Sequence, residues 1–227
     1  MSEQPHSSEA PDRQGGPSSD EFVPWRYPPE LECDMATRDG RTLHLRPIRA
    51  DDAEKLEAFH SRLSGDSIYR RYFLMHPTLS VAELTHLTQV DYVDRLALVI
   101  EDGEQLVAVG RYDRYPMTTR AEVAFVVADD HQHLGLGIEL LERLADAAWV
   151  RGITTFSAET MVSNREMMSV FRRSGFPVAS TFSDGEISVR FPIEPTDAYE
   201  AARASRHTRS ERGAERGAER LDGPGPT

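Results

Sequence analysis

A glutamine and two glycines, Gln132, Gly135 and Gly137, separate an apolar segment from an amphipathic one. Glycine lets the backbone approach a ligand or another backbone closely. If a helix begins here, its first turn presents unpaired N–H groups and a partial positive charge, which together bind anions. The spacing therefore favours a loop that holds a phosphate chain, although a simple strand-to-helix turn can use the same glycines.

The apolar segment just upstream carries one carboxylate, Glu122. In a strand over residues 121–127, Glu122 shares a face with Val126, and its small apolar neighbours would partly desolvate it. A carboxylate in such surroundings can remove a proton from an amine, which makes Glu122 a candidate general base. The structural alternative is an ion pair with an arginine such as Arg111 or Arg114.

Two better-known phosphate-binding templates do not fit the loop. No Lys-Ser or Lys-Thr pair follows the glycines, and the third glycine of the dinucleotide-binding pattern is missing. Nucleotide hydrolases and NAD-dependent enzymes are therefore poor interpretations. His131 and His133 flank Gln132, but no carboxylate or cysteine cluster with ligand spacing accompanies them, so we expect no metal site.

Hydrophobic periodicity predicts a mixed α/β chain. Asp51 with Glu54, and Ser163 with Glu166, have the spacing of capping boxes that begin helices. Leu141, Leu144, Ala145 and Ala148 form the expected buried stripe of one helix. We expect strands from residue 42 and over 96–100, 106–112, 121–127, 178–183 and 186–192, and helices from residue 51 and over 67–73, 81–89, 136–150 and from residue 163 onward.

Three consecutive segments resemble the GCN5-related N-acetyltransferases, the GNAT family. They are AEVAFVV, the Q-x-x-G-x-G loop at Gln132, and TTFSAETMVSNREMMSVFRRSGF over 154–176. The resemblance implies a mixed, mostly antiparallel central sheet flanked by helices, and an N-acetyltransferase that uses acetyl-CoA as co-substrate. It places Glu122 at the general base of the histone-acetylating members. It also implies that CoA is held by Val126, Val127, Gln132, His133, Leu134, Gly135, Leu136, Gly137, Ile138 and Asn164.

One position departs from the family pattern. Many members have a tyrosine seven residues after the CoA-contacting asparagine, where it acts as general acid toward the CoA thiolate; here Asn164 is followed at that distance by Phe171. The CoA thiol is acidic enough to leave without a proton, so activity is not excluded. Tyr112 and Tyr115 are alternative acids.

The similarity narrows over residues 42–180 to the bacterial protein lysine acetyltransferases of the Pat type. It rests on LRPIRADDAEKLEAFHSRLSGDSIYRRYF, VDRLALVI, AEVAFVVAD and NREMMSVFRRSGFP. The resemblance implies that the acceptor is a reactive lysine of another protein, an acyl-CoA synthetase. Regulatory domains occur in several such enzymes, and we expect none in a chain of this length. Two alternatives stay open: a small-molecule amine acetyltransferase, and a catalytically silent CoA-binding module.

Composition indicates one domain with two tails. Residues 1–34 and 196–227 are poor in large apolar side chains, so we expect a disordered N-terminal tail, an acetyltransferase domain over 35–195, and a disordered or frayed-helical C-terminal tail. The single cysteine, Cys33, excludes an intrachain disulfide. No signal peptide or membrane-length apolar run is found, so we expect a cytoplasmic protein without a membrane partner.

The formal net charge of −12 argues against nucleic acid as a partner, because a basic face supplies most of the affinity for phosphates. A cationic acceptor such as a lysine suits this sign better, although a negative charge also serves plain solubility. The oligomeric state is left open.

Overall fold

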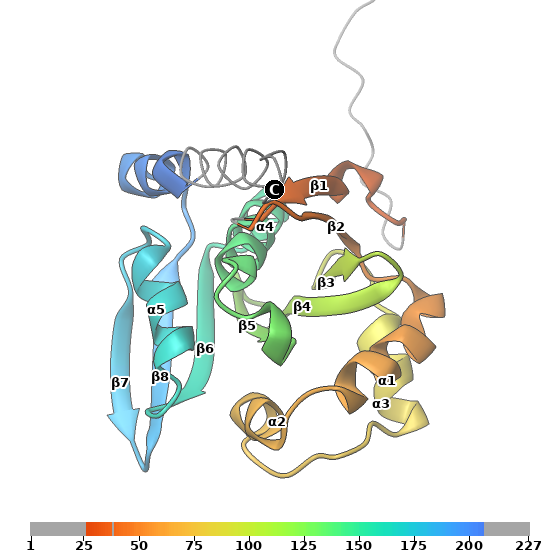
Figure 1. Cartoon of the computed structure of the whole chain (residues 1–227). Coiled ribbons are helices and arrows are strands. Elements are labelled where there is room, and N and C mark those ends of the chain that lie inside the picture. Colours follow the sequence, from red (N-terminus) through yellow and green to blue (C-terminus); the bar gives the residue numbers. More distant parts are fainter. Residues whose placement is uncertain (1–25, 38, 207–227) are drawn as a thin grey trace, which may run out of the picture.

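The computed structural model describes residues 26–37 and 39–206 of the chain (Figure 1). The expected disordered tails fall largely on residues 1–25 and 207–227, which lie outside the described part. Within the described part, no helix is both long and apolar enough to cross a membrane.

The strands described by the structure form one eight-stranded sheet with the order β1-β2-β3-β4-β5-β6-β8-β7 (Figure 1). Neighbouring strands are antiparallel except β5 and β6, which are parallel. The mixed, mostly antiparallel sheet expected from the sequence is confirmed. The strands are β1 (Cys33–Ala36), β2 (Thr42–Pro47), β3 (Arg95–Asp102), β4 (Gln105–Arg114), β5 (Arg120–Val127), β6 (Thr155–Met161), β7 (Ala179–Ser183) and β8 (Glu186–Pro192).

Alternate residues of the central strands feed two cores, one on each face of the sheet, as the two-residue period of a strand requires. In β3, Leu96, Leu98 and Ile100 belong to one core, and Ala97 and Val99 to the other. Helices α4 (Leu136–Val150) and α5 (Arg165–Arg173) cover the first face, and α1 (Ala53–Ser61), α2 (Gly65–Tyr72) and α3 (Val81–Thr88) cover the second. Short 3-10 turns are η1 (Pro29–Leu31), η2 (Ala50–Asp52) and η3 (Asp129–His131).

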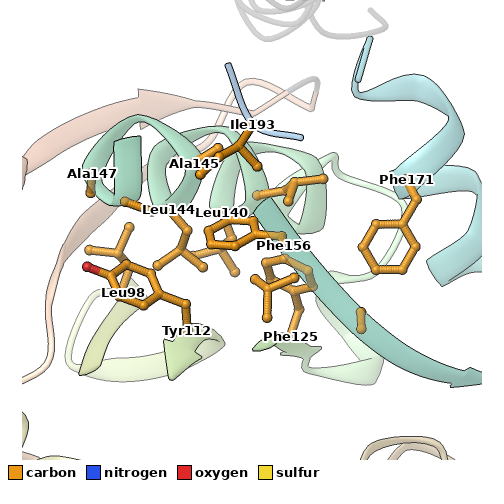
Figure 2. Close-up of a cluster of buried hydrophobic side chains, with 14 of the residues drawn as sticks. Leu98, Tyr112, Phe125, Leu140, Leu144, Ala145, Ala147, Phe156, Phe171 and Ile193 are labelled. Carbon is orange, nitrogen blue, oxygen red and sulfur yellow. The ribbon is translucent and has the colours of Figure 1, made fainter. Parts of the chain in front are cut away.

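Helix α4 lies across the centre of the sheet, close to Tyr112 and Phe125 of the strands (Figure 2). All four residues of its predicted apolar stripe are buried, which confirms that prediction. Gly110 of β4 lies under this helix, and a Cβ there would stand 2.9 Å from Phe125 Cδ1 and 3.1 Å from Leu140 Cβ. A side chain at Gly110 would therefore push α4 off the sheet.

Strands β5 and β6 separate soon after they meet. They pair at only three positions, and the last is Glu122 opposite Ser157. Beyond it, β6 continues to pair with β8 as far as Met161, and β5 continues to pair with β4 as far as Val127. The facing edges of β5 and β6 are thus left without strand partners, and they open a V in the sheet.

The ordered structure extends beyond the expected domain limits of 35 and 195. Strand β1 begins at Cys33, and residues 197–206 are helical. Tyr199 is 1% exposed and stacks on Phe176 with ring centroids 4.4 Å apart. Arg203 Nη1 lies 2.7 Å from Asp146 Oδ2 of α4, so this helical segment packs on the back of α4.

Both predicted capping boxes are wrong, because α1 and α5 have Asp52 and Asn164 as N-cap residues, and Asp52 makes no side-chain cap hydrogen bond to α1. Asp52 precedes α1, and its Oδ2 accepts the Arg49 N–H at 2.7 Å. Asn164 is the N-cap of α5, and its Oδ1 accepts the Met167 N–H at 3.0 Å. Asn164, which the family resemblance assigned to CoA contact, therefore caps α5 with its carboxamide oxygen.

Candidate active site

A cleft of about 390 Å³ lies where β5 leaves β6. Its walls come from the end of β5, the loop into α4, and the helices α5 and α2. The lining contains every predicted CoA-contact residue except Leu134. Its residues are Ser67, Arg70, Arg71, Phe125, Val126, Val127, His131, Gln132, His133, Gly135, Leu136, Gly137, Ile138, Asn164, Arg165, Glu166, Met167, Ser169, Val170 and Arg173.

The glycine loop takes a left-handed conformation at two points, with φ 64° at His133 and 94° at Gly135. Gly135 is the N-cap of α4, and nothing lies within 4 Å of a Cβ built on it. The requirement for glycine at this position is therefore one of backbone angle and not of space. Gly137 differs, because a Cβ there would come 3.3 Å from Val170 Cγ2 of α5.

The start of α4 presents free donors to the cleft. The N–H groups of Leu136 and Gly137 make no hydrogen bond to any described residue, as expected for the first turn of a helix. The N–H of Ile138, another predicted CoA contact, differs because it donates to the Gly135 carbonyl oxygen at 3.2 Å. Two unpaired N–H groups and the positive end of the helix can therefore face a pyrophosphate.

Gln132 and Asp129 connect this loop to α2. Gln132 Nε2 lies 3.4 Å from both Ser67 Oγ and the Val127 carbonyl oxygen. Asp129 accepts hydrogen bonds from Ser64 N–H at 2.9 Å, Ser64 Oγ at 2.7 Å and Ser67 Oγ at 2.8 Å. Asp129 is itself exposed, and it anchors the N-terminus of the helix that walls the cleft.

His131 is likewise more constrained than a solvated loop histidine. It is 9% exposed, and its ring lies between two carboxylates, with Nδ1 2.7 Å from Asp130 Oδ1 and Nε2 3.1 Å from Asp102 Oδ2. The hydrogen bond to His131 lowers the pKa of Asp130. In the described residues, no group of three or more His, Cys, Asp and Glu side chains is arranged to hold a metal ion.

Four arginines line the cleft that sequence reasoning did not single out. Arg70 and Arg71 come from α2, and Arg165 and Arg173 from α5. Arg70 Nη1 approaches Glu166 Oε2 of α5 at 3.3 Å, so the two helices meet over the cleft. The signal available in the sequence was a local excess of arginine in a strongly acidic chain. These cations suit a ligand that carries several phosphates.

Glu122 lies at the inner end of the V and is exposed, so the predicted desolvation is wrong. Its carboxylate makes no hydrogen bond or ion pair with the described residues. The alternative of an ion pair with an arginine is also wrong. Arg111 donates to the Leu87 carbonyl oxygen at 2.8 Å, and Arg114 pairs with Asp94 at 3.0 Å.

The two candidate acids have different surroundings. Tyr112 is 0% exposed and donates to the Val93 carbonyl oxygen at 2.9 Å, so it is a core residue and not an acid of the site. Tyr115 is 38% exposed, and its hydroxyl lies 3.1 Å from the Oγ of Ser157, the residue paired with Glu122. The candidate base and the remaining tyrosine are thus linked through one serine.

Phe171 explains the departure from the family pattern in structural terms. It is 1% exposed, and its ring centroid lies 6.4 Å from that of Phe125 and 5.6 Å from that of Phe191 (Figure 2). The side chain contributes to the hydrophobic core that holds α5 against the sheet.

Comparisons with known proteins agree with this geometry. A family model described as the acetyltransferase (GNAT) family matches residues 65–176. Acetyltransferase PA5475 of Pseudomonas aeruginosa is 34% identical over 142 residues, which make up 61% of this chain and 76% of that protein. Acetyltransferase Pat of Mycolicibacterium smegmatis is 32% identical over 145 residues, 62% of this chain, and the matched region spans only 43% of that relative's length.

Among solved structures, the GNAT domain of S. lividans PAT superposes with a TM-score of 0.70 at 38% identity. The match covers 74% of this chain and 99% of that domain. Fold, cleft and sequence similarity agree, and the chain belongs to the GNAT family of acetyl-CoA-dependent N-acetyltransferases.

Proposed function

We propose that the protein transfers the acetyl group of acetyl-CoA to the side-chain amine of a lysine in another protein, an acyl-CoA synthetase. The observation that carries the choice of a protein acceptor is the exposure of Glu122. This carboxylate lies outside the linings of both cavities described for this structure, at an open surface beside Tyr115. A lysine on the surface of a large partner can reach such a position without entering a pocket.

The residues of the cleft fit acetyl-CoA. The free N–H groups of Leu136 and Gly137 and the arginines of α2 and α5 would hold its phosphates. The unpaired edge of β5 at Val126 and Val127 offers backbone groups to an extended pantetheine chain, as an exposed strand edge does for a peptide. Acetyl-CoA supplies the activated acyl group; the chain supplies orientation and the base.

Lysine has a solution pKa of about 10.4, so an acceptor ammonium must lose a proton before it can attack. Glu122 accepts that proton, directly or through a water. The amide C–N bond forms, the nitrogen gives its second proton to water, the thioester C–S bond breaks, and CoA leaves as the thiolate. Ser157 and Tyr115 next to Glu122 are positioned to orient the incoming amine.

The variant Glu122→Gln tests this assignment because it keeps the shape and removes the base. We expect turnover to fall by about 10²- to 10⁴-fold with little change in acetyl-CoA affinity. Glu104→Gln, at an exposed position in the β3–β4 turn, is the matched control and should keep wild-type turnover.

The acceptor is tested by incubating the protein and acetyl-CoA with a purified AMP-forming acyl-CoA synthetase. We expect one acetyl group on the catalytic lysine of the synthetase and loss of its activity, and neither with Glu122→Gln. Rapid acetylation of small free amines beside an untouched synthetase would assign the protein to small-molecule substrates. Binding of acetyl-CoA without turnover on any acceptor would indicate a silent CoA-binding module.

A further inference from the structure

Two buried arginines of this fold differ in whether they have carboxylate partners. Arg46 of β2 is 4% exposed, and its guanidinium makes short ion pairs with Asp52 at 2.7 Å and Glu101 at 2.8 Å. Arg111 of β4 is 7% exposed, and its side chain makes one hydrogen bond, to the Leu87 carbonyl oxygen, and no ion pair with any residue in 26–37 or 39–206. A guanidinium has five N–H donors, so Arg111 is left with most of its donors unused.

A buried charge without a counter-ion is costly, and proteins normally pair it or neutralise it. Asp113 is the nearest acid along the strand, but its carboxylate is bound to Arg95 at 2.9 Å. Burial therefore prevails over the attraction of Asp113 and lowers the pKa of Arg111 to about 10, whereas the pKa of Arg46 is raised. The fold supplies the carboxylates that Arg46 needs and leaves Arg111 without one.

Arg111 lines a small cavity of about 30 Å³ under α1, α2 and α3. A second polar group there is also unused, because His60 is 3% exposed and its Nε2 has no hydrogen-bond partner in the described part of the chain. The remaining wall is mostly apolar. The lining consists of Leu56, Phe59, His60, Leu63, Arg71, Tyr72, Leu79, Leu87, Val109, Arg111, Ala124 and Val126.

This side cavity adjoins the CoA cleft, since Val126 and Arg71 line both. Val126 belongs to the free edge of β5, next to which the thioester end of an extended donor would lie. A group that continues past the thioester carbonyl on this side of the sheet would therefore run toward Arg111. A buried water needs about 10–15 Å³ measured in the same way, so the cavity holds a group of two or three heavy atoms.

We propose that the side cavity receives the end of the donor's acyl group and that Arg111 makes the enzyme favour acyl groups ending in a carboxylate, such as malonyl and succinyl, over neutral acyl groups of the same length. The proposal rests on the proposed function for the site of the thioester and adds the class of acyl donor. The transfer is the same as with acetyl: the ammonium gives one proton to Glu122, the amide C–N bond forms, the nitrogen gives its second proton to water, the C–S bond breaks and CoA thiolate leaves. The acyl carboxylate stays intact as the counter-ion of Arg111.

The test is calorimetric binding of two matched pairs of donors to the full chain, succinyl-CoA against butyryl-CoA and malonyl-CoA against propionyl-CoA. We expect the carboxylate-bearing member of at least one pair to bind about ten- to a hundredfold more tightly, as a hydrogen-bonded charge pair allows. In Arg111→Met this ratio should fall to about one. Arg190→Met removes an exposed cation of β8 that lines neither cavity, and it should keep the wild-type ratio.

Equal affinities within both pairs in the wild type would overturn the proposal whatever the variants do, so it does not depend on the folding of Arg111→Met. A preference that persists in folded Arg111→Met, checked by circular dichroism, would also overturn it. Arg111→Met could instead change only the KM of an acceptor that carries a carboxylate. The carboxylate that pairs with Arg111 would then come from the acceptor, and the assignment to the acyl donor would be wrong. Because binding needs no turnover, failure of the proposed lysine transfer would leave this result readable.

Discussion

The two glycines at the start of α4 are required for different structural reasons. Gly135 is needed for its backbone angle, whereas Gly137 is needed for the close approach of Val170 on α5. A side chain at Gly137 would therefore displace α5 as well as crowd the loop. Gly137 thus serves the packing of two helices as well as the loop.

Gly135→Ala should weaken acetyl-CoA binding by placing a residue with a Cβ at φ 94°. We expect a loss of about 1–2 kcal/mol in stability and an increase in the Kd of acetyl-CoA, measured by calorimetry. Gly152→Ala, at φ 76° and just beyond the other end of α4, carries similar strain away from the cleft. It should cost similar stability and leave the Kd unchanged; equal effects on the Kd would argue against the phosphate loop.

Among the elements, α2 depends on a loop far from it in sequence for its position. Asp129 holds Ser64 and Ser67 at its N-terminus, and the helix carries two arginines of the cleft. Although burial opposes it, hydrogen bonding from Ser64 and Ser67 keeps the pKa of Asp129 below its ordinary value. This stabilisation is complete at neutral pH and is lost only as the pH falls through the lowered pKa.

Asp129→Ala should release α2 and raise the Kd of acetyl-CoA several-fold, with a loss of about 1–3 kcal/mol in stability from the unpaired serine donors. Thermal unfolding and calorimetric titration measure the two effects. Asp66→Ala, in the exposed first turn of the same helix, is the control. A wild-type Kd in Asp129→Ala would show that α2 keeps its place without this anchor.

Sequence periodicity predicted the elements that bury one clear face, such as β5 and α4. The two-residue alternation around Phe125 and the stripe at Leu144 follow directly from local geometry. It did not predict β1, the burial of His131 or the cleft arginines, because each depends on residues distant in the chain. His131 lies next to Asp102, and β1 pairs with β2 through a register that no local pattern encodes. The exposure of Glu122 follows from the V between two strands, which alternation alone does not reveal.

On the scale of the whole molecule, the helical segment 197–206 is part of the folded unit. Tyr199 is buried on Phe176, and Arg203 and Arg206 pair with acids of α4. We propose a functional domain that extends to residue 206. A protein truncated to 35–195 should unfold at a lower temperature than one spanning 26–206. Its free energy of unfolding should be smaller by about 3–5 kcal/mol, the loss expected when a large buried aromatic side chain is removed. Identical melting curves would place the boundary at 195.

The same segment gives stability a pH dependence. Burial, only partly offset by Arg206, raises the pKa of Glu142 to about 7 from its ordinary value of 4.5. The folded chain thus holds this proton more tightly than the unfolded chain does. Its contribution to stability is complete below about pH 4.5 and declines as the pH rises toward 7. Glu142→Gln should flatten this part of the stability–pH curve; an unchanged slope would assign it to other groups.

The V between β5 and β6 divides the sheet into two hydrogen-bonded halves, β1 to β5 and β6 to β8, joined by three residue pairs. A donor lying in the cleft would touch β5 on one side and α5 on the other, and so act as a cross-link between the halves. Amide hydrogen exchange should therefore slow on both sides of the V when acetyl-CoA binds, in proportion to the binding free energy. In mechanical terms, the bound donor acts as a brace that stiffens the junction between the two halves of the sheet.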